Sequence, residues 1–352
     1  MNSATKKKII SAAAPFITAL KVHQLFAPFY HGIGHILTFH RVLPLDNRQR
    51  IHNHLSLEIS PIQLENTIHF FKERNYKFWS LDQLSRNIKK KDNPKFVVFT
   101  FDDGYYDNYD FAYPILKKHN IPFTIYITTN FPDRKAILWW YLLEDVLLEE
   151  TSITFHWQEK NYFFPTKNQS EKESAFDQIR SLINQCQSIS QQKELLELVL
   201  KDHYLKHKTY AKRLTMNWDE IKELSNDPLV TIGAHTVNHF SLTRLNELQL
   251  ADEILKSKNI IELQIDRPVE HFAYPFGKSA EASIREFEFI KQANFKTATT
   301  TRMGNIFPQH QNYMECLPRL SINRASTNKV LQIQISGLLS CLVHKGKKII
   351  TH

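Results

Sequence analysis

Short apolar runs without helical spacing alternate with amphipathic segments along most of the chain. The run at 95–101 is rich in β-branched and aromatic residues, which predicts a buried strand. Similar runs predict strands at 36–39, 123–127, 229–233, 271–277, 296–300 and 317–322. Helical spacing predicts helices at 61–71, 81–91, 107–119, 217–225, 245–263 and 280–294. Pro61 suits the first position of its helix, and Asn217 and Glu220 have the spacing of a capping box. This alternation is typical of an α/β fold with a parallel sheet.

The alternation stops between about 132 and 215. This stretch opens with Trp139 and Trp140 and continues through a polar middle rich in lysine and glutamine, with helical patterns. We interpret it as a largely helical insertion at the active end of the sheet, within a domain that spans 35–325. Such insertions commonly act as lids or substrate platforms, and the alternative is that this one serves only packing.

Both ends of the chain are basic and apolar. Residues 1–34 carry Lys6 to Lys8 and an apolar run to Leu20, and residues 326–352 predict a helical tail with a basic end. The leading run is similar to a signal peptide, but Pro15 interrupts it and a clear small-residue cleavage site is missing. It is also shorter than the roughly 20 apolar residues that cross a bilayer. We expect a cytoplasmic protein or one peripheral to the inner membrane face, with export as the alternative.

The net charge indicates which kinds of partner the protein binds, and the cysteine spacing indicates whether it has disulfides or a cysteine metal site. The formal net charge is +9 and the pI is about 9.2, which favours an anionic partner such as a phosphorylated substrate or an acidic membrane surface. We find no nucleic-acid-binding fingerprint, so nucleic acid is not an expected partner. Cys186, Cys316 and Cys341 are scattered, which indicates a reduced set rather than a disulfide framework or a cysteine metal site.

Two adjacent carboxylates end the predicted strand at 95–101. Asp102 and Asp103 are followed by Gly104, at the end of the strand where α/β proteins place their chemistry. Neighbouring carboxylates repel, so the pair indicates a bound cation or one raised pKa. The alternative is a polar turn that simply leaves the strand.

Two histidines follow the strand predicted at 229–233. His235 and His239 are four residues apart, and on a helical turn both imidazoles would face the same way. Because the carboxyl ends of parallel strands meet at one edge of the sheet, we expect these histidines to converge with Asp102 and Asp103. Two imidazoles and a carboxylate suit Zn²⁺ or a similar divalent ion.

Three motifs resemble those of one enzyme family. Thr100–Gly104, His235–His239 and Phe272–Gly277 are similar, in this order, to successive motifs of the polysaccharide deacetylase family, also called the NodB-homology or carbohydrate esterase family 4 domain. The resemblance covers about 35–323 apart from the insertion. It implies a distorted (β/α)7-type barrel with a helical insertion.

The resemblance also implies a role for each matching residue. Asp102 would be the general base, and the metal ligands would be Asp103, His235 and His239. The backbone N–H of Phe276 would donate to the oxyanion. These roles agree with chemistry in which a metal ion acidifies water while a carboxylate accepts its proton. Candidates for contacting the substrate are Tyr274, Trp139 and Trp140.

Amide hydrolysis also needs an acid for the departing amine. His40 follows the strand at 36–39, and this placement resembles the branch of poly-N-acetylglucosamine deacetylases in which the acid histidine comes first in the chain. Ala273 stands where the family motif usually carries an arginine, which leaves Asp102 without an orienting partner. Arg319, at the end of a late predicted strand, is a candidate replacement, or else a residue of an ordinary salt bridge. The family's Asp-Trp motif, which would tune the acid, is not found.

These observations predict a metal-dependent hydrolase, with Zn²⁺ as the expected ion, that removes an N-acetyl or similar acyl group from an amino sugar. The basic, apolar ends favour a cell-envelope glycan or glycolipid precursor, with peripheral contact to a membrane. The alternative is a catalytically impaired glycan-binding protein on the same fold, which Ala273 keeps open.

Overall fold

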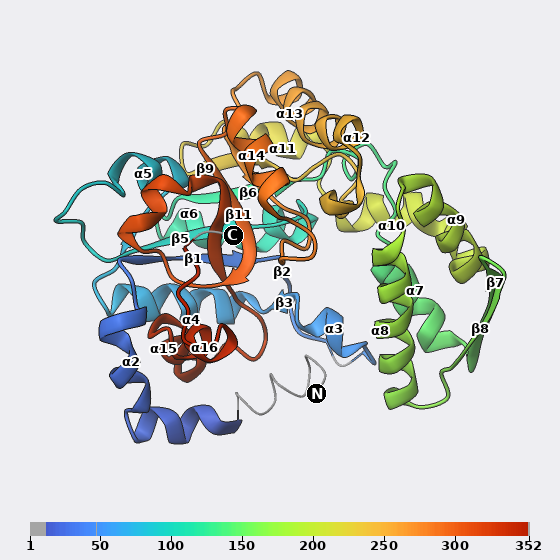
Figure 1. Cartoon of the computed structure of the whole chain (residues 1–352), viewed down its shortest axis with the longest axis horizontal. Helices are drawn as coiled ribbons and strands as arrows, with labels where there is room; N and C mark the ends of the chain where they lie inside the picture. Colours follow the sequence, from blue (N-terminus) through green and yellow to red (C-terminus); the bar gives the residue numbers. More distant parts are fainter. Residues whose placement is uncertain (1–11, 47, 351–352) are drawn as a thin grey trace.

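The computed structural model describes residues 12–46 and 48–350 (Figure 1). Within these residues, seven parallel strands close into a barrel in sequence order. The strands are β1 (Gly34–Phe39), β5 (Phe96–Phe101), β6 (Phe123–Ile127), β9 (Val230–Ala234), β10 (His271–Ala273), β11 (Thr297–Met303) and β12 (Leu317–Ser321). β1 closes the barrel because it pairs with β12 on one side and with β5 on the other. The predicted barrel is thus confirmed.

The burial of the strands explains their composition. Every residue of β1 and β5 is buried, as expected for parallel strands that are covered on both faces. The short strand β4 (Lys77–Phe78) extends the sheet beside the first residues of β5. The strand predicted at 271–277 ends early, at Ala273, because Pro275 and the positive φ of Phe276 and Gly277 turn the chain away from the sheet.

Helices cover the outside of the barrel. They are α4 (Pro61–Lys72), α5 (Leu81–Asn87), α6 (Tyr113–Lys118), α11 (Trp218–Ser225), α12 (Glu247–Ala251), α13 (Ser257–Ile265), α14 (Ile284–Gln292), α15 (Asn328–Ile335) and α16 (Leu338–Val343). Short π and 3-10 segments are η1 (Asn108–Ala112), η3 (Leu242–Arg244), η4 (Asp252–Lys256), η5 (Pro308–Asn312) and η6 (Met314–Cys316). The π turns η1 and η4 interrupt the helices predicted at 107–119 and 245–263. Pro61 occupies the first turn of α4, and the capping box of Asn217 and Glu220 begins α11, as predicted.

The insertion projects to one side of the barrel (right in Figure 1). It contains α7 (Trp139–Glu149), α8 (Gln169–Gln185), α9 (Ile189–Leu200), η2 (Lys201–Lys206) and α10 (His207–Leu214). It also contains an antiparallel hairpin of β7 (Ser152–Trp157) and β8 (Lys160–Pro165), which the sequence analysis did not predict. The signal was present, since Ile153, Phe155 and Trp157 alternate with exposed residues and point inward.

Two further regions complete the fold. Between β1 and α4 the chain forms β2 (Arg41–Val42), α3 (His52–Leu55) and β3 (Glu58–Ile59). Before β1, a helix at 12–19 and α2 (Val22–Tyr30) pack beside α15 and α16. Over the described residues, no helix is both long enough and apolar enough to cross a bilayer.

Candidate active site

The carboxyl ends of the barrel strands meet at a cleft of about 560 Å³, which we call the mouth cleft. Asp102 and Asp103 follow β5, His235 and His239 follow β9, and His40 follows β1. All five residues line the mouth cleft. The structure therefore brings together residues that are as much as 199 positions apart (239 − 40) in the sequence.

Asp103, His235 and His239 form a group with the spacing of metal ligands. One candidate ligand atom from each lies within 4.8 Å of the others. Asp103 Oδ1 is 3.4 Å from His235 Nε2 and 3.2 Å from His239 Nε2. This oxygen is buried and accepts no hydrogen bond from the described residues. A buried carboxylate oxygen facing two imidazoles fits a divalent cation, because the ion would satisfy all three groups.

The surroundings of His235 fix its orientation. Its Nδ1 lies 2.7 Å from the backbone oxygen of Ala273, so Nδ1–H donates to that carbonyl and Nε2 faces Asp103. Burial lowers the pKa of His235, but Asp103 and Asp102 outweigh burial and raise it. Burial raises the pKa of Asp103, but His239 and His235 outweigh burial and hold the pKa of that carboxyl well below its usual range. The site is thus electrostatically arranged to hold positive charge.

The segment from His235 to His239 is a loop, so the predicted helical turn is wrong. Thr236 and His239 have positive φ values of 68° and 56°. The two imidazoles converge because the loop turns sharply, with Thr236 Oγ1 accepting the backbone N–H of His239 at 3.0 Å. The i, i+4 spacing therefore predicted the correct pair for the wrong geometric reason.

Glu253 holds this loop from outside, in the π turn η4. Its carboxylate accepts the backbone N–H groups of Val237 at 3.0 Å and of Asn238 at 2.9 Å, and the Asn238 side chain at 2.5 Å. Glu253 is buried, and burial raises its pKa. Glu253 was not predicted from the sequence. A glutamate three positions after Leu250, on the core face of an amphipathic helix, was the available signal.

Asp102 lies in a different environment from its neighbour. Arg319 donates to both of its oxygens, at 2.7 Å each, and is itself fixed by the carbonyl of Thr300 and the hydroxyl of Thr100. Burial raises the pKa of Asp102, but the charge and hydrogen bonds of Arg319 outweigh burial and lower it. Asp102 is therefore ionised at neutral pH. Arg319 supplies the partner that Ala273 cannot.

His40 lines the mouth cleft beside Asp102. Its Nε2 is 4.0 Å from Asp102 Oδ2, and its side chain is partly exposed to the cleft. Burial lowers the pKa of His40, and Asp102 and Asp103 act in the opposite direction. The imidazole thus faces the same space as Asp102 without being hydrogen-bonded to it.

Phe276 also borders the mouth cleft. Its backbone has a φ of 60°, and no described residue accepts a hydrogen bond from its N–H. Its ring centroid lies 4.8 Å from that of His239. The left-handed turn after Pro275 therefore leaves this backbone N–H without an acceptor among the described residues, in a residue that borders the mouth cleft.

The predicted substrate-contacting aromatics divide into two groups. Trp139 and Trp140 line the mouth cleft, and the ring centroid of Trp140 is 5.3 Å from that of His239. Tyr274 does not line it, so its predicted substrate contact is wrong. Its side chain is fully buried and its hydroxyl donates to the carbonyl of Glu315 at 2.8 Å. It points inward because it directly follows β10 and packs between Phe272 and Phe287.

The segment before α4 forms a wall of the mouth cleft that the sequence analysis missed. His54, Ser56 and Leu57 line the cleft together with residues of α8, and the ring centroid of His54 is 5.3 Å from that of Phe176 in α8. Nothing in the local sequence marked this segment, because its place depends on contacts with the insertion. Arg180 of the insertion, with Arg244 and Lys278 of the barrel loops, also lines the cleft.

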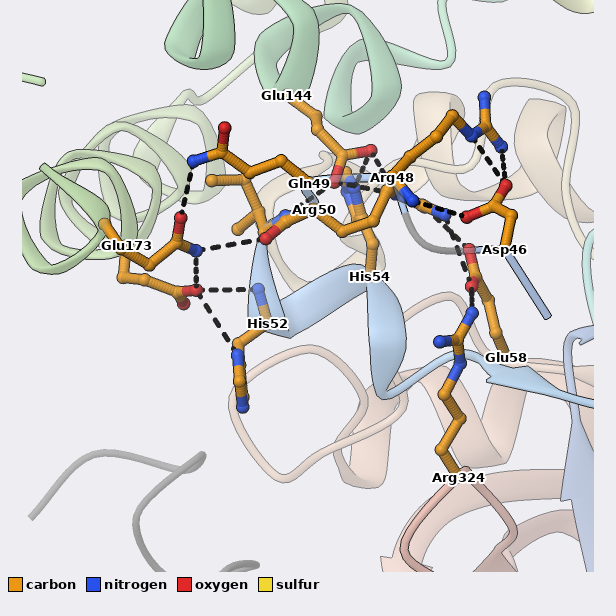
Figure 2. Close-up of polar contacts among 12 residues, drawn as sticks. Asp46, Arg48, Gln49, Arg50, His52, His54, Glu58, Glu144, Glu173 and Arg324 are labelled. Carbon is orange, nitrogen blue, oxygen red and sulfur yellow. Dashed lines mark hydrogen bonds and ion pairs between the residues drawn. The ribbon is translucent and has the colours of Figure 1, made fainter.

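Buried ion pairs join this wall to both the insertion and the barrel (Figure 2). Arg50 lies between Glu58 of β3, at 2.6 Å, and Glu144 of α7, at 3.0 Å. His54 approaches Glu144 to 2.8 Å, and Arg324, just after β12, pairs with Glu58 at 2.6 Å. Burial raises the pKa of Glu144, but His54 and Arg50 outweigh it and lower the pKa to about 2. These charges fix where the insertion stands over the barrel.

The chain matches the family model described as polysaccharide deacetylase over residues 89–297. This chain belongs to the polysaccharide deacetylase family. The match includes Asp102, Asp103, His235, His239 and Phe276, and the predicted resemblance is confirmed.

One curated relative also matches. The chain is 30% identical over 134 residues to YxkH of Bacillus subtilis (strain 168), whose name places it among the polysaccharide deacetylases. The match covers 37% of this chain, and the chain spans about half (48%) of the length of that relative.

Solved structures share the fold. The Streptococcus pyogenes deacetylase PplD, in complex with acetate, is 18% identical with a TM-score of 0.51, covering 86% of this chain and 97% of that one. IcaB from Ammonifex degensii is 16% identical with a TM-score of 0.53, covering 87% and 97%. A de-N-acetylase from Aggregatibacter actinomycetemcomitans is 15% identical with a TM-score of 0.51, covering 85% and 99%. At these identities the similarity establishes the barrel.

Proposed function

We propose that this protein is a metal-dependent N-deacetylase that hydrolyses the N-acetyl group of an amino sugar. The observation that carries the proposal is the different setting of two adjacent carboxylates. Asp103 faces His235 and His239, whereas Asp102 is held by Arg319. One carboxylate can therefore bind a cation while the other stays available as a base at the same cleft.

The donor set supports Zn²⁺ as the ion. Two imidazoles and one carboxylate are borderline and hard ligands that suit Zn²⁺, and three protein ligands leave a position open. When bound, the ion would supply Lewis-acid chemistry by polarising the acetamide carbonyl and acidifying water.

The other groups then have distinct tasks. Asp102 accepts a proton from the water that attacks the carbonyl carbon, and Arg319 keeps this carboxylate ionised and in place. The N–H of Phe276 donates to the carbonyl oxygen as negative charge develops on it. His40 donates a proton to the nitrogen as the C–N bond breaks, so that acetate and the free amine leave.

The mouth cleft supports a sugar substrate. Its volume of about 560 Å³ is sufficient for a few sugar rings, and Trp139, Trp140 and Phe176 offer aromatic faces. Arg244 and Lys278 are exposed on its border, which favours a polar or anionic glycan. We propose a cell-envelope glycan or glycolipid precursor, handled at the cytoplasmic side of the membrane.

The test is release of acetate from N-acetylglucosamine oligomers by the purified protein, with metal content measured on the same sample. We expect acetate release that stops after chelation and returns when Zn²⁺ is added. A metal-loaded protein that binds the oligomers and releases no acetate would instead indicate a glycan-binding protein. Mass spectrometry of glycans and glycolipids from cells with and without the Asp102→Asn variant would identify the substrate.

A further inference from the structure

The helix at 12–19 and α2 have an inner face that is fully used in packing. Ala14 and Ile17 join an apolar cluster with residues of α15 and α16. His23 is buried, and its Nε2 lies 3.0 Å from the side-chain nitrogen of Gln332 in α15. The inner face therefore holds the two helices on α15 and α16, and their outer face makes no part of this contact.

The outer face of the same helices is apolar. Phe16 and Leu20 are 73% and 75% exposed, and Leu25 and Phe29 are 73% and 64% exposed. Each pair is spaced i, i+4, so its two side chains lie on one side of the helix. A surface helix normally turns polar residues outward, so this face is unusual.

The neighbouring helix α16 also exposes apolar side chains. Leu342 and Val343 at its end are exposed, and α16 contacts α2. We call the exposed apolar residues of these three helices the terminal surface: Phe16, Leu20, Leu25, Phe29, Leu342 and Val343.

The two terminal segments that form the terminal surface carry charges of one sign. Residues 1–45 and 316–352 contain no aspartate or glutamate. Lys21, Lys345 and Lys347 are exposed. The segment around Gly346 lies against α2, because the Tyr30 hydroxyl donates to the carbonyl of Gly346 at 2.8 Å. The basic tail is thus held next to the apolar residues.

We propose that the terminal surface docks on an anionic lipid membrane. Exposed apolar side chains surrounded by lysines, with no acidic residue in either terminal segment, match an interface of acyl chains and negatively charged headgroups. A second copy of this chain fits less well, because two lysine-bearing faces without acidic residues would repel each other.

The geometry favours a position in the plane of the membrane surface. The two helices are short, and they are separated by a turn at Lys21, whose φ is 54°. Neither approaches the roughly 20 residues that a spanning helix needs. The apolar outer face would therefore lie at the headgroup boundary while the inner face stays on α15 and α16.

The terminal surface is separate from the mouth cleft. α2 leads into the amino end of β1, whereas the mouth cleft lies at the carboxyl ends of the strands. Figure 1 shows α2 and α16 at lower left and the insertion at right. Membrane docking can therefore be tested without disturbing the proposed chemistry.

The experiment is co-sedimentation of the full-length, metal-loaded protein with vesicles of phosphatidylcholine alone or mixed with phosphatidylglycerol. We expect the wild type to bind the mixed vesicles. We expect Leu25→Ser/Phe29→Ser to bind them about tenfold more weakly, or weaker still. The matched control is Leu248→Ser/Leu263→Ser, because these leucines are 81% and 83% exposed on barrel helices. The control should bind as the wild type does.

A second pair of variants tests the charge. Lys345→Gln/Lys347→Gln should weaken binding to the mixed vesicles roughly fivefold per lysine, and added salt should reduce the difference. Lys89→Gln/Lys90→Gln removes two exposed lysines elsewhere and should have little effect. Equal losses in both pairs would overturn the proposal.

Two further outcomes would overturn it. One is a wild type that does not sediment with the mixed vesicles. The other is a wild-type dimer by light scattering that Leu25→Ser/Phe29→Ser converts to a monomer, which would assign the surface to a second copy. Acetate release from soluble oligomers, measured on every variant, keeps the two proposals distinct, because it should not change with membrane binding.

Discussion

The barrel mouth and the terminal surface depart from the usual distribution of side chains in opposite directions. At the mouth, Asp102, Asp103 and Arg319 are buried, although charged groups normally stay in water. On the terminal helices, Phe16 and Leu25 are exposed, although large apolar groups normally avoid water. Each departure costs free energy unless another group compensates for it.

The compensation differs between the two regions. Buried charges are balanced individually: Arg319 pairs with Asp102, and His235 and His239 face Asp103. Removal of one partner therefore leaves the other buried without its counter-charge, which costs a large desolvation free energy. Exposed apolar groups have no internal partner, so their removal leaves the fold unchanged. The same comparison predicts large effects for substitutions at the mouth and small effects on stability at the terminal surface.

The largest effect is expected from the two aspartates. Asp103→Ala should lose bound metal and activity together, because it removes a ligand. Asp102→Asn should retain metal and lose turnover by roughly 10²–10⁴, the usual contribution of a general base. Metal content and acetate release, measured on each purified variant, decide between the roles. Equal metal loss in both variants would contradict the assignment.

Arg319→Ala should destabilise the fold by about 3–5 kcal/mol, because it leaves the Asp102 carboxylate buried without its partner. Denaturant unfolding measures this loss. The matched control is the double variant Arg319→Met/Asp102→Asn, in which neither charge remains. It should recover most of the free energy of unfolding but not activity. No recovery in the double variant would show that Arg319 acts mainly through its contacts with Thr100 and Thr300.

The ion pairs under the insertion predict a pH dependence of stability. The pKa of Glu144 is lowered to about 2 from an ordinary value of 4.5. A lowered pKa stabilises the folded state above pH 4.5, and this contribution is lost as the pH falls toward 2. The wild type should therefore lose up to about 3 kcal/mol more than Glu144→Gln across this window. Unfolding measured at a series of acidic pH values provides the test, and parallel curves would contradict it.

Glu253→Ala should weaken metal binding roughly 10–100-fold, because it releases the loop that carries His235 and His239. Calorimetric titration with Zn²⁺ measures the affinity independently of activity. Asp252→Asn is the control, since Asp252 is the exposed neighbour in the same turn. If both variants bind Zn²⁺ as the wild type does, the loop is held by its own backbone turn.

The smallest effect is expected at the terminal surface. Phe16→Ser should change the free energy of unfolding by no more than about 0.5 kcal/mol, because its side chain is already in water. Ile17→Ser, one residue later on the packed face, should cost more. Similar losses for both substitutions would show that the outer face contributes to folding and is not a free surface.

The repeating strands and helices, and most of the residues at the mouth, could be predicted from the sequence. Buried parallel strands need continuous apolar runs, so each strand and its carboxyl end can be predicted from the sequence. Because these ends meet at one edge of the sheet, the residues that follow them could be placed at one cleft: Asp102, Asp103, His235, His239 and His40. The sequence also showed both apolar, basic ends. Each of these features depends on residues that are close together in the chain, so a local pattern was enough to predict it.

Which distant groups meet could not be predicted from the sequence, because it depends on how the elements pack. Arg319 lies 217 residues from Asp102 and faces it because β12 closes the barrel against β1, beside β5. Glu253 reaches the histidine loop because a helix packs behind it, and Tyr274 points away because its strand ends at Ala273. Segment 50–58 becomes a wall of the cleft through the pairs of Arg50 and His54 with Glu144. Such contacts depend on the relative position of whole elements, which no local pattern of residues specifies.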